Sequence, residues 1–313
     1  MKRVIINFLT ICTFFILTSC SNSDLSKIAP VYSSGKQDSH KVFFIPEPEM
    51  NQNIISYLKN KDDITIVGKV EEIATNTKYV IGPVKYNDTV NASKLLPKTK
   101  FFSLSNNIDI AGKNIYLLGV HPHDQINALL KYHSVTGMKN LYVIAPRSKL
   151  NSDIISYINQ SVSKYNMTVA KIEQYTESSL DYSVKSVAAN LSTATQIDGI
   201  LILGHANNLR DVFDKFIEKK INIDNFRVLG LNQYDDLSES DKEIMKNVYF
   251  AGSYDYENIN NKFLLYYLDG LAIIDQIKQG KKANSEFIVY SGTGKFSKHV
   301  FKRALRVFTL GTK

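Results

Sequence analysis

The chain has 313 residues, of which 44% are hydrophobic, and this length allows two modest hydrophobic cores. Its formal net charge is +8, but lysine and arginine are scattered rather than gathered into the basic stripe of a nucleic-acid-binding protein. A short basic cluster near the end is expected to be the solvated edge of the last strands; it comprises Lys295, Lys298, Lys302, Arg303 and Arg306.

The N-terminus carries the most specific signal in the chain. Lys2 and Arg3 precede an apolar segment, residues 4–17, that is too short to be expected to span a membrane. The segment ends in Leu17-Thr18-Ser19-Cys20, which resembles the lipobox of bacterial lipoproteins. Cys20 is therefore the expected first residue of the mature chain and the site of lipidation. An ordinary secretory signal with an incidental cysteine is the alternative.

The segment around the lipobox also indicates a compartment. Residues 1–19 are expected to be a lipoprotein signal peptide and residues 20–40 a flexible lipid-linked tether, since residues 21–39 are polar without apolar periodicity. Cys12 leaves with the signal, so no internal disulfide is expected. The expected localisation is the bacterial cell envelope, facing the periplasm. Ser21 after the cysteine favours the outer membrane, by analogy with enteric bacteria.

The folded part is expected to begin with a short strand at residues 42–45, stopped by Pro46. A short helix at residues 51–60 and a strand at residues 64–70 follow. Only about one helical turn fits between that strand and the next one, which begins near Val80.

Three β-branched and aromatic runs between residues 78 and 125 each end abruptly in polar or helix-breaking residues. The first ends at Gly82-Pro83, the second at Ser105, and the third at Pro122, with Asp124 as the expected N-cap of the next helix. In open α/β sheets, ligands bind beyond the carboxyl ends of the strands. The sequence therefore predicts a ligand-facing edge here.

A second alternation of strands and helices follows. Strands are expected at residues 141–144, 168–175, 199–203, 226–231 and 248–251. Helices are expected between them, one beginning at an N-cap Ser238. This rhythm predicts a doubly wound parallel sheet with helices on both faces. A long apolar helix at residues 261–279 and the closing run SGTGKFSKHVFKRALRVFTLGTK complete the chain.

The ordered series GPV, SLSNN, LLGVHPHDQ, long apolar helix and closing G-x-G-x-F run resembles the type I periplasmic binding proteins, the leucine-binding-protein superfamily. Within it, the resemblance is closest to the penicillin-binding protein activator lipoproteins. It covers roughly residues 41–313 and implies two α/β lobes joined by three chain crossings. The implied N-terminal lobe comprises residues 41–119 and 253–313, and the C-terminal lobe residues 120–252.

The resemblance also implies a ligand cleft between the lobes. The positions that correspond to the family's cleft contacts are Tyr86, Asn87, Ser105, Asn107, His205 and Asn232. Each can equally be an ordinary polar residue at a strand end. Two departures weaken amino-acid binding: the early helix is short, and Pro146-Arg147-Ser148 replaces the family's aromatic-glycine pair.

Catalytic and metal motifs are weak. His121, His123 and Asp124 have zinc-ligand chemistry, but no further cluster completes a site, so an exposed hinge loop is expected. The Gly-rich residues 291–295 lack P-loop spacing and are expected to form a hairpin turn. No G-x-S-x-G elbow is present. We therefore expect no enzyme, no metal and no cofactor.

Two functions remain. The first is a non-enzymatic, lipid-anchored regulator that docks on an envelope protein, expected to be a cell-wall synthase. The second is the substrate-binding lipoprotein of an ABC importer, with a permease as its partner and an amino acid or other small polar ligand in its cleft. We expect no nucleic acid and a membrane contact through the lipid anchor only.

Overall fold

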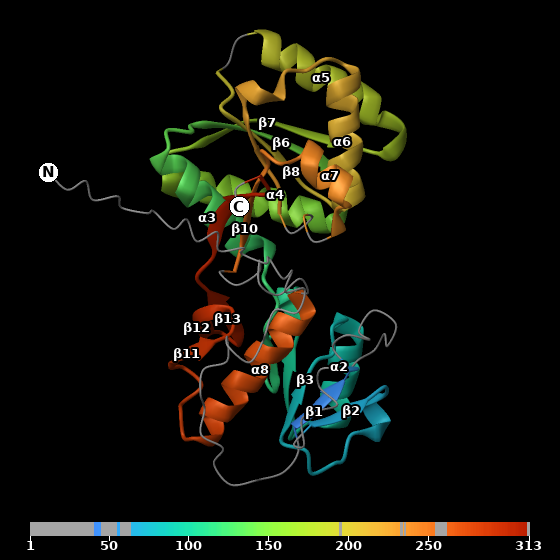
Figure 1. The fold of residues 1–313 in the computed structure, drawn as a ribbon, viewed down its shortest axis with the longest axis vertical. Coiled ribbons are helices and arrows are strands. Elements are labelled where there is room, and N and C mark those ends of the chain that lie inside the picture. The colour runs from blue at the N-terminus through green and yellow to red at the C-terminus, as the bar shows by residue number, and fades with distance from the viewer. Residues whose placement is uncertain are drawn as a thin grey trace, which may run out of the picture.

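A computed structural model describes residues 41–44, 55–56, 64–193, 196–231, 234, 236–253 and 262–311. These residues form two sheets in two lobes that lie one above the other in Figure 1. The signal peptide, Cys20, the tether and Asn232 lie outside the described residues. None of the described helices is long and apolar enough to cross a membrane.

The first lobe is built on an eight-stranded sheet with the order β11-β12-β13-β5-β4-β3-β1-β2. All neighbouring strands from β2 to β13 are parallel, and β12 and β11 run antiparallel beyond them. Its elements are β1 (Lys41–Phe44), β2 (Ile64–Val67), β3 (Tyr79–Ile81), α2 (Tyr86–Leu95), β4 (Lys100–Ser103), the 3-10 helix η4 (Ile108–Ile110), β5 (Ile115–Leu117), α8 (Lys262–Lys278), β11 (Glu286–Val289), β12 (Gly292–Ser297) and β13 (Val300–Arg303).

The second lobe is built on a six-stranded sheet with the order β14-β10-β9-β8-β6-β7, parallel except for β14. Its elements are α3 (Pro122–Val135), β6 (Asn140–Pro146), α4 (Lys149–Ser161), β7 (Thr168–Tyr175), α5 (Leu180–Thr193), β8 (Gly199–Ile202), α6 (Ala206–Glu218), β9 (Arg227–Leu229), α7 (Glu239–Ile244), β10 (Tyr249–Gly252) and β14 (Arg306–Thr309).

Side-chain alternation along each strand explains why helices cover both faces of the second sheet. On β6, Leu141, Val143 and Ala145 face α3 and α4 in one core. The intervening Tyr142 and Ile144 face α5 and α6 in the other core. The first sheet is covered in the same way, with α8 on one face and α2 on the other. The doubly wound α/β architecture of both lobes was predicted correctly.

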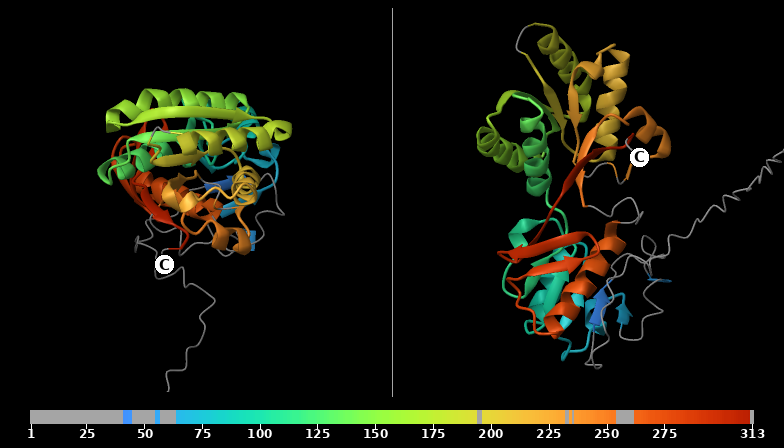
Figure 2. Two further views of the ribbon diagram at one scale, coloured as in Figure 1. Left: turned by 90° about the horizontal axis from the view of Figure 1, so that it is seen from above. Right: turned by 60° about the vertical axis from the view of Figure 1, so that its left-hand side comes forward.

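The chain passes between the two sheets three times, as the sequence resemblance implied. It leaves the first sheet after β5, returns after β10 through α8, and leaves again after β13. The last crossing is visible where the red C-terminal strand runs from the lower into the upper lobe (Figure 2, right).

The structure corrects three local expectations. The closing run was assigned wholly to the first lobe, but β14 pairs antiparallel with β10 and belongs to the second sheet. The hairpin turn expected at residues 291–295 lies at Tyr290 and Ser291, and Gly292 already begins β12. His121, not Asp124, is the N-cap of α3, because Pro122 occupies the first helical turn and Asp124 follows inside it. The N-cap expected at Ser238 is confirmed by its bond from the Asp241 amide.

Candidate functional site: the interlobe cleft and hinge

The floor of the predicted cleft in the first lobe is a network of internal hydrogen bonds. Gly82 has a φ of +98° and precedes a cis peptide bond to Pro83. The Pro83 carbonyl accepts hydrogen bonds from the Leu104 amide at 3.1 Å and the Ser103 hydroxyl at 2.9 Å. The Thr89 hydroxyl lies 2.8 Å from that of Ser103 and ties α2 to the same point. The ends of β3 and β4 are thus joined to each other rather than left open to a ligand.

Ser105 and Asn107, the expected donors to a ligand carboxylate, serve their own turn. Ser105 is buried, and its amide donates to the Ser103 hydroxyl at 3.1 Å. The Asn107 amide donates to the Ser105 hydroxyl at 3.2 Å, and the Asn107 side chain accepts from the Asp109 amide to cap η4. The Asn107 amide that would bind a carboxylate is therefore engaged within the turn.

The other predicted cleft residues lie on helix starts. Tyr86 and Asn87 form the first turn of α2 and are exposed, Tyr86 by 48%. Both residues therefore follow β3 on a helix. His205 is the exposed N-cap of α6, and its amide donates to the Asn208 side chain at 2.9 Å. These three side chains are exposed where a strand leads into a helix. Whether they share one ligand remains a prediction.

The crossing after β5 is held in a close backbone approach. A side chain at Gly119 would place its Cβ 2.8 Å from the Leu104 carbonyl oxygen and 2.9 Å from that of Ser105. Two residues later, the Nδ1 atom of buried His121 lies 2.9 Å from the Asn106 carbonyl. Burial lowers the pKa of His121, against the opposite effect of that carbonyl. The neutral ring therefore fixes the crossing against the turn after β4.

Two ion pairs from β13 flank the same crossing. Lys302 donates to the Asp124 carboxylate at 2.8 Å, joining the first-lobe sheet to the first turn of α3. Arg303 forms a pair with Asp269 of α8 at 2.7 Å, and both side chains are almost completely buried. The guanidinium also donates to the Leu118 carbonyl at the end of β5. These interactions make the hinge a cross-linked unit of β5, β13, α3 and α8.

Sequence reasoning missed these hinge roles. Lys302 and Arg303 were assigned to a solvated strand edge, and only Arg303, two residues after buried Phe301, had a position that suggested burial. Their partners lie 178 and 34 residues away in the chain, so no local pattern marks them.

The H-x-H motif does not converge on a metal position. His121 points its Nδ1 at Asn106, whereas the His123 ring stacks on Tyr157 with centroids 3.8 Å apart. Burial lowers the pKa of His123 as well. Among the residues that the structure describes, no group of three histidine, cysteine or acidic side chains has the arrangement of a metal site.

A hollow that sequence reasoning did not anticipate lies at the other end of the second sheet. Its volume is about 1260 Å³, and it is lined at the amino ends of β8, β9 and β10 by Asp198, Arg227 and Tyr249. The Arg227 guanidinium donates to the Thr136 carbonyl at 2.8 Å. Because the strands are parallel, this hollow is far from their carboxyl ends and separate from the predicted cleft.

Comparison with solved structures places this architecture in a known class. The C-terminal domain of LpoA from Haemophilus influenzae, described as a regulator of PBP1A, matches with a TM-score of 0.64 and 11% identity, over 87% of this chain and 98% of that one. Full-length LpoA matches with a TM-score of 0.62 and 12% identity over 89% of this chain. This chain spans only 59% of full-length LpoA.

Solute-binding proteins of ABC transporters match equally well. One from Rhodopseudomonas palustris, in complex with 3,4-dihydroxybenzoic acid, has a TM-score of 0.63 and 11% identity over 86% of this chain and 92% of that one. No family model and no curated protein sequence matches the chain.

The protein therefore has the two-lobed fold of the type I periplasmic binding proteins, as its sequence resemblance predicted. Both LpoA and the ABC solute-binding proteins share that fold with it. At 10–12% identity, the likeness is one of architecture. The choice between regulator and solute-binding protein must come from the cleft itself.

Proposed function

We propose that the protein is a lipid-anchored, non-enzymatic regulator of the bacterial cell envelope, acting on a cell-wall synthase through its surfaces. The fold supports this role, because a PBP1A regulator has the same architecture. The lipobox at residues 17–20 supports the anchor. The alternative, an importer subunit, has the same fold and would need a polar cleft that can close on a ligand.

We favour the regulator over the importer subunit because of the hydrogen bonding of the backbone amides that would bind a ligand's carboxylate. The Asn107 amide and the Ser105 amide both donate to serine hydroxyls of their own turn. An amino acid's carboxylate would have to displace these bonds or remain unpaired. An unpaired charge in a closed cleft costs on the order of a few kcal/mol. Micromolar affinity corresponds to a binding free energy of about 8 kcal/mol, so this cost would remove a large part of it.

Calorimetric titration of the mature chain with leucine, isoleucine and valine tests this choice. We expect no binding in the micromolar range. The ABC transporter substrate-binding protein of Desulfitobacterium hafniense, solved in complex with Leu, is the matched positive control because it has the same fold. Micromolar binding to our protein would instead favour the importer subunit.

The partner is tested separately by affinity purification from detergent extracts of the source cells. We expect a cell-wall synthase among the co-purifying envelope proteins, and we expect the purified synthase to change its rate when our protein is added. Recovery of an ABC permease with no synthase would contradict the proposal.

A further inference from the structure

The two lobes differ sharply in charge. The described residues of the first lobe, 64–119 and 262–303, include 15 lysine or arginine residues and 7 aspartate or glutamate residues. Those of the second lobe, 120–253 and 304–311, include 15 and 14. Nearly all of the net positive charge of the described fold therefore belongs to the first lobe.

Four of these lysines form what we call the lysine row: Lys78, Lys100, Lys113 and Lys298. Each lies at or within two residues of the start of a parallel strand, β3, β4, β5 or β13 respectively. These four strands are consecutive neighbours in the sheet. At about 4.8 Å between strands, the row spans about 15 Å along one end of the lobe.

Backbone hydrogen bonds fix the alignment of the row. The Lys100 amide donates to the Lys78 carbonyl at 2.9 Å. The residues after Lys113 and Lys298 are also bonded to the neighbouring strands: the Asn114 carbonyl accepts from Phe101 of β4, and the His299 carbonyl accepts from Leu117, the last residue of the three-residue β5, each at 2.8 Å. The four lysines therefore share the amino end of the sheet, opposite the cleft.

The row is exposed and has no ion-pair partner among the described residues. Lys94 and Lys98, at the end of α2, are exposed beside β4 and extend the basic surface. The acidic residues of the segments before these strands are Glu71 and Glu72 on the 3-10 helix η3 (Val70–Glu72), Asp109 on η4, and Glu286 at the start of β11, two strands beyond β13. The surface is thus predominantly positive.

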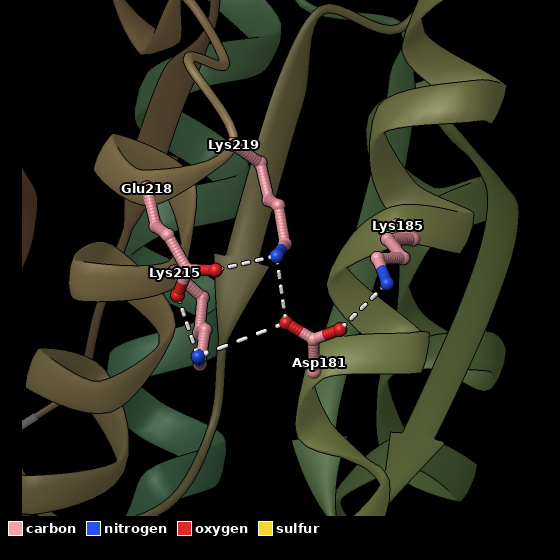
Figure 3. Close-up of polar contacts among 5 residues, drawn as sticks. All are labelled: Asp181, Lys185, Lys215, Glu218 and Lys219. Atoms are coloured by element: carbon pink, nitrogen blue, oxygen red, sulfur yellow. Dashed lines mark hydrogen bonds and ion pairs between the residues drawn. The ribbon is translucent and has the colours of Figure 1, made fainter.

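One group of second-lobe lysines, on α5 and at the end of α6, shows a contrasting arrangement. Asp181 on α5 accepts from Lys185 at 2.9 Å and from Lys219 of α6 at 2.8 Å (Figure 3). Glu218 pairs with both Lys215 and Lys219. Hydrogen bonds from Lys219 and Lys185 hold the pKa of the Asp181 carboxyl well below its usual range. These lysines are neutralised locally, whereas the lysine row is not.

The chain enters the fold at the same end as the lysine row. β1 is parallel to β3, with Lys41 in register with Tyr79, the residue after Lys78. Twenty residues separate Lys41 from Cys20, and even fully extended they span at most about 70 Å. A lipid on Cys20 would therefore be joined to the fold at this end of the first lobe, through a tether of at most about 70 Å.

We propose that the lysine row is a docking surface for anionic phospholipid headgroups, which orients the protein with its first lobe on the membrane and its cleft and second lobe away from it. Lysines next to an anionic bilayer each strengthen binding by about fivefold, and a row of four acts additively at short range. The proposed orientation on the membrane rests on the lipid anchor of the proposed function. The electrostatic contact itself does not depend on that anchor.

Vesicle co-sedimentation tests the contact without the lipid. The protein is residues 21–313, which contain the whole described fold and lack Cys20. The vesicles contain phosphatidylglycerol and phosphatidylcholine at 30:70, or phosphatidylcholine alone. We expect binding to the anionic vesicles only, and we expect about 1 M salt to abolish it because the screening length falls to about 3 Å.

A fourfold variant, K78Q/K100Q/K113Q/K298Q, should weaken binding to anionic vesicles by about a hundredfold or more. The matched control, K131Q/K139Q/K149Q/K164Q, removes four exposed second-lobe lysines that form no ion pair with any other residue the structure describes, and it should bind like the unmodified chain. Circular dichroism of both variants checks that the fold is intact.

Equal loss in both variants, or no binding of the unmodified chain to anionic vesicles at low salt, would overturn the proposal. Binding that instead requires a soluble anionic glycan and ignores vesicles would overturn it in favour of a polymer. None of these results tests whether the protein regulates a synthase. The affinity purification and the rate assay test that independently.

Discussion

The buried Arg303–Asp269 pair at the hinge gives the sharpest stability prediction. The Asp269 carboxylate accepts from the Arg303 Nη2 at 2.7 Å and Nε at 3.1 Å, and from the Ser291 hydroxyl at 2.6 Å. Asp269 and Arg303 are 0% and 1% exposed at their side chains. Asp269→Ala would leave a guanidinium without its counterion in a dry site. We expect this substitution to lower the free energy of unfolding by about 3–5 kcal/mol.

Urea denaturation followed by circular dichroism measures this loss. The double variant Asp269→Leu with Arg303→Met removes both charges, and we expect it to recover more than half of the lost stability, because the pair is costly to desolvate. The Lys302–Asp124 pair is the internal control, since its side chains are 33% and 22% exposed. Asp124→Ala should cost only about 1 kcal/mol.

Two results would refute this reasoning. The first is a cost for Asp269→Ala no greater than that for Asp124→Ala. The second is a double variant as unstable as the single one, which would mean that the loss comes from the Ser291 contacts and not from the stranded charge.

Two further predictions concern single residues. His133 is buried beneath Tyr249 with neither ring nitrogen hydrogen-bonded, and burial lowers its pKa to about 4. The unfolded histidine binds a proton below about pH 6.5, whereas the folded one does so only near pH 4. The free energy of unfolding should therefore fall by up to about 3 kcal/mol between pH 6.5 and 4. Urea titrations of His133→Phe should show a smaller dependence of this free energy on pH. Cys20→Ser should abolish acylation and release the protein from membranes at high salt; a variant that stays wholly with the membrane under those conditions would place the anchor elsewhere.

The alternation of apolar periodicities was enough to predict two α/β units from the sequence. Buried strands such as residues 141–144 and 199–203 are continuous apolar runs, and helices such as α6 carry an apolar stripe of Leu209, Val212 and Phe213. These are local patterns, set by the 2.0 and 3.6 residue periods of strands and helices. Strand ends at Gly82 and Ser105 were placed correctly for the same reason, because turn-forming residues mark them directly.

Local patterns did not show what the strand-end residues do. Ser105 is a residue type suited to a ligand contact, yet its hydroxyl accepts from the Asn107 amide within the turn after β4. The assignment of β14 to the first sheet was also wrong. The sequence of a four-residue strand does not identify its pairing partner, which the structure shows to be β10. The β14 pairing depends on hydrogen bonds between distant segments, whereas the Ser105 bond spans two residues but is not revealed by residue type.

The sequence by itself determined the element order and the two-lobed α/β architecture, and it predicts the lipobox, since each rests on residues adjacent in the chain. The tertiary structure alone decided the hinge pairs and the lysine row. Lys78 and Lys298 are 220 residues apart in the sequence. They lie at the same end of the sheet because β3, β4, β5 and β13 run parallel. Parallel strands have their amino ends on one side of the sheet, however far apart they are in the sequence.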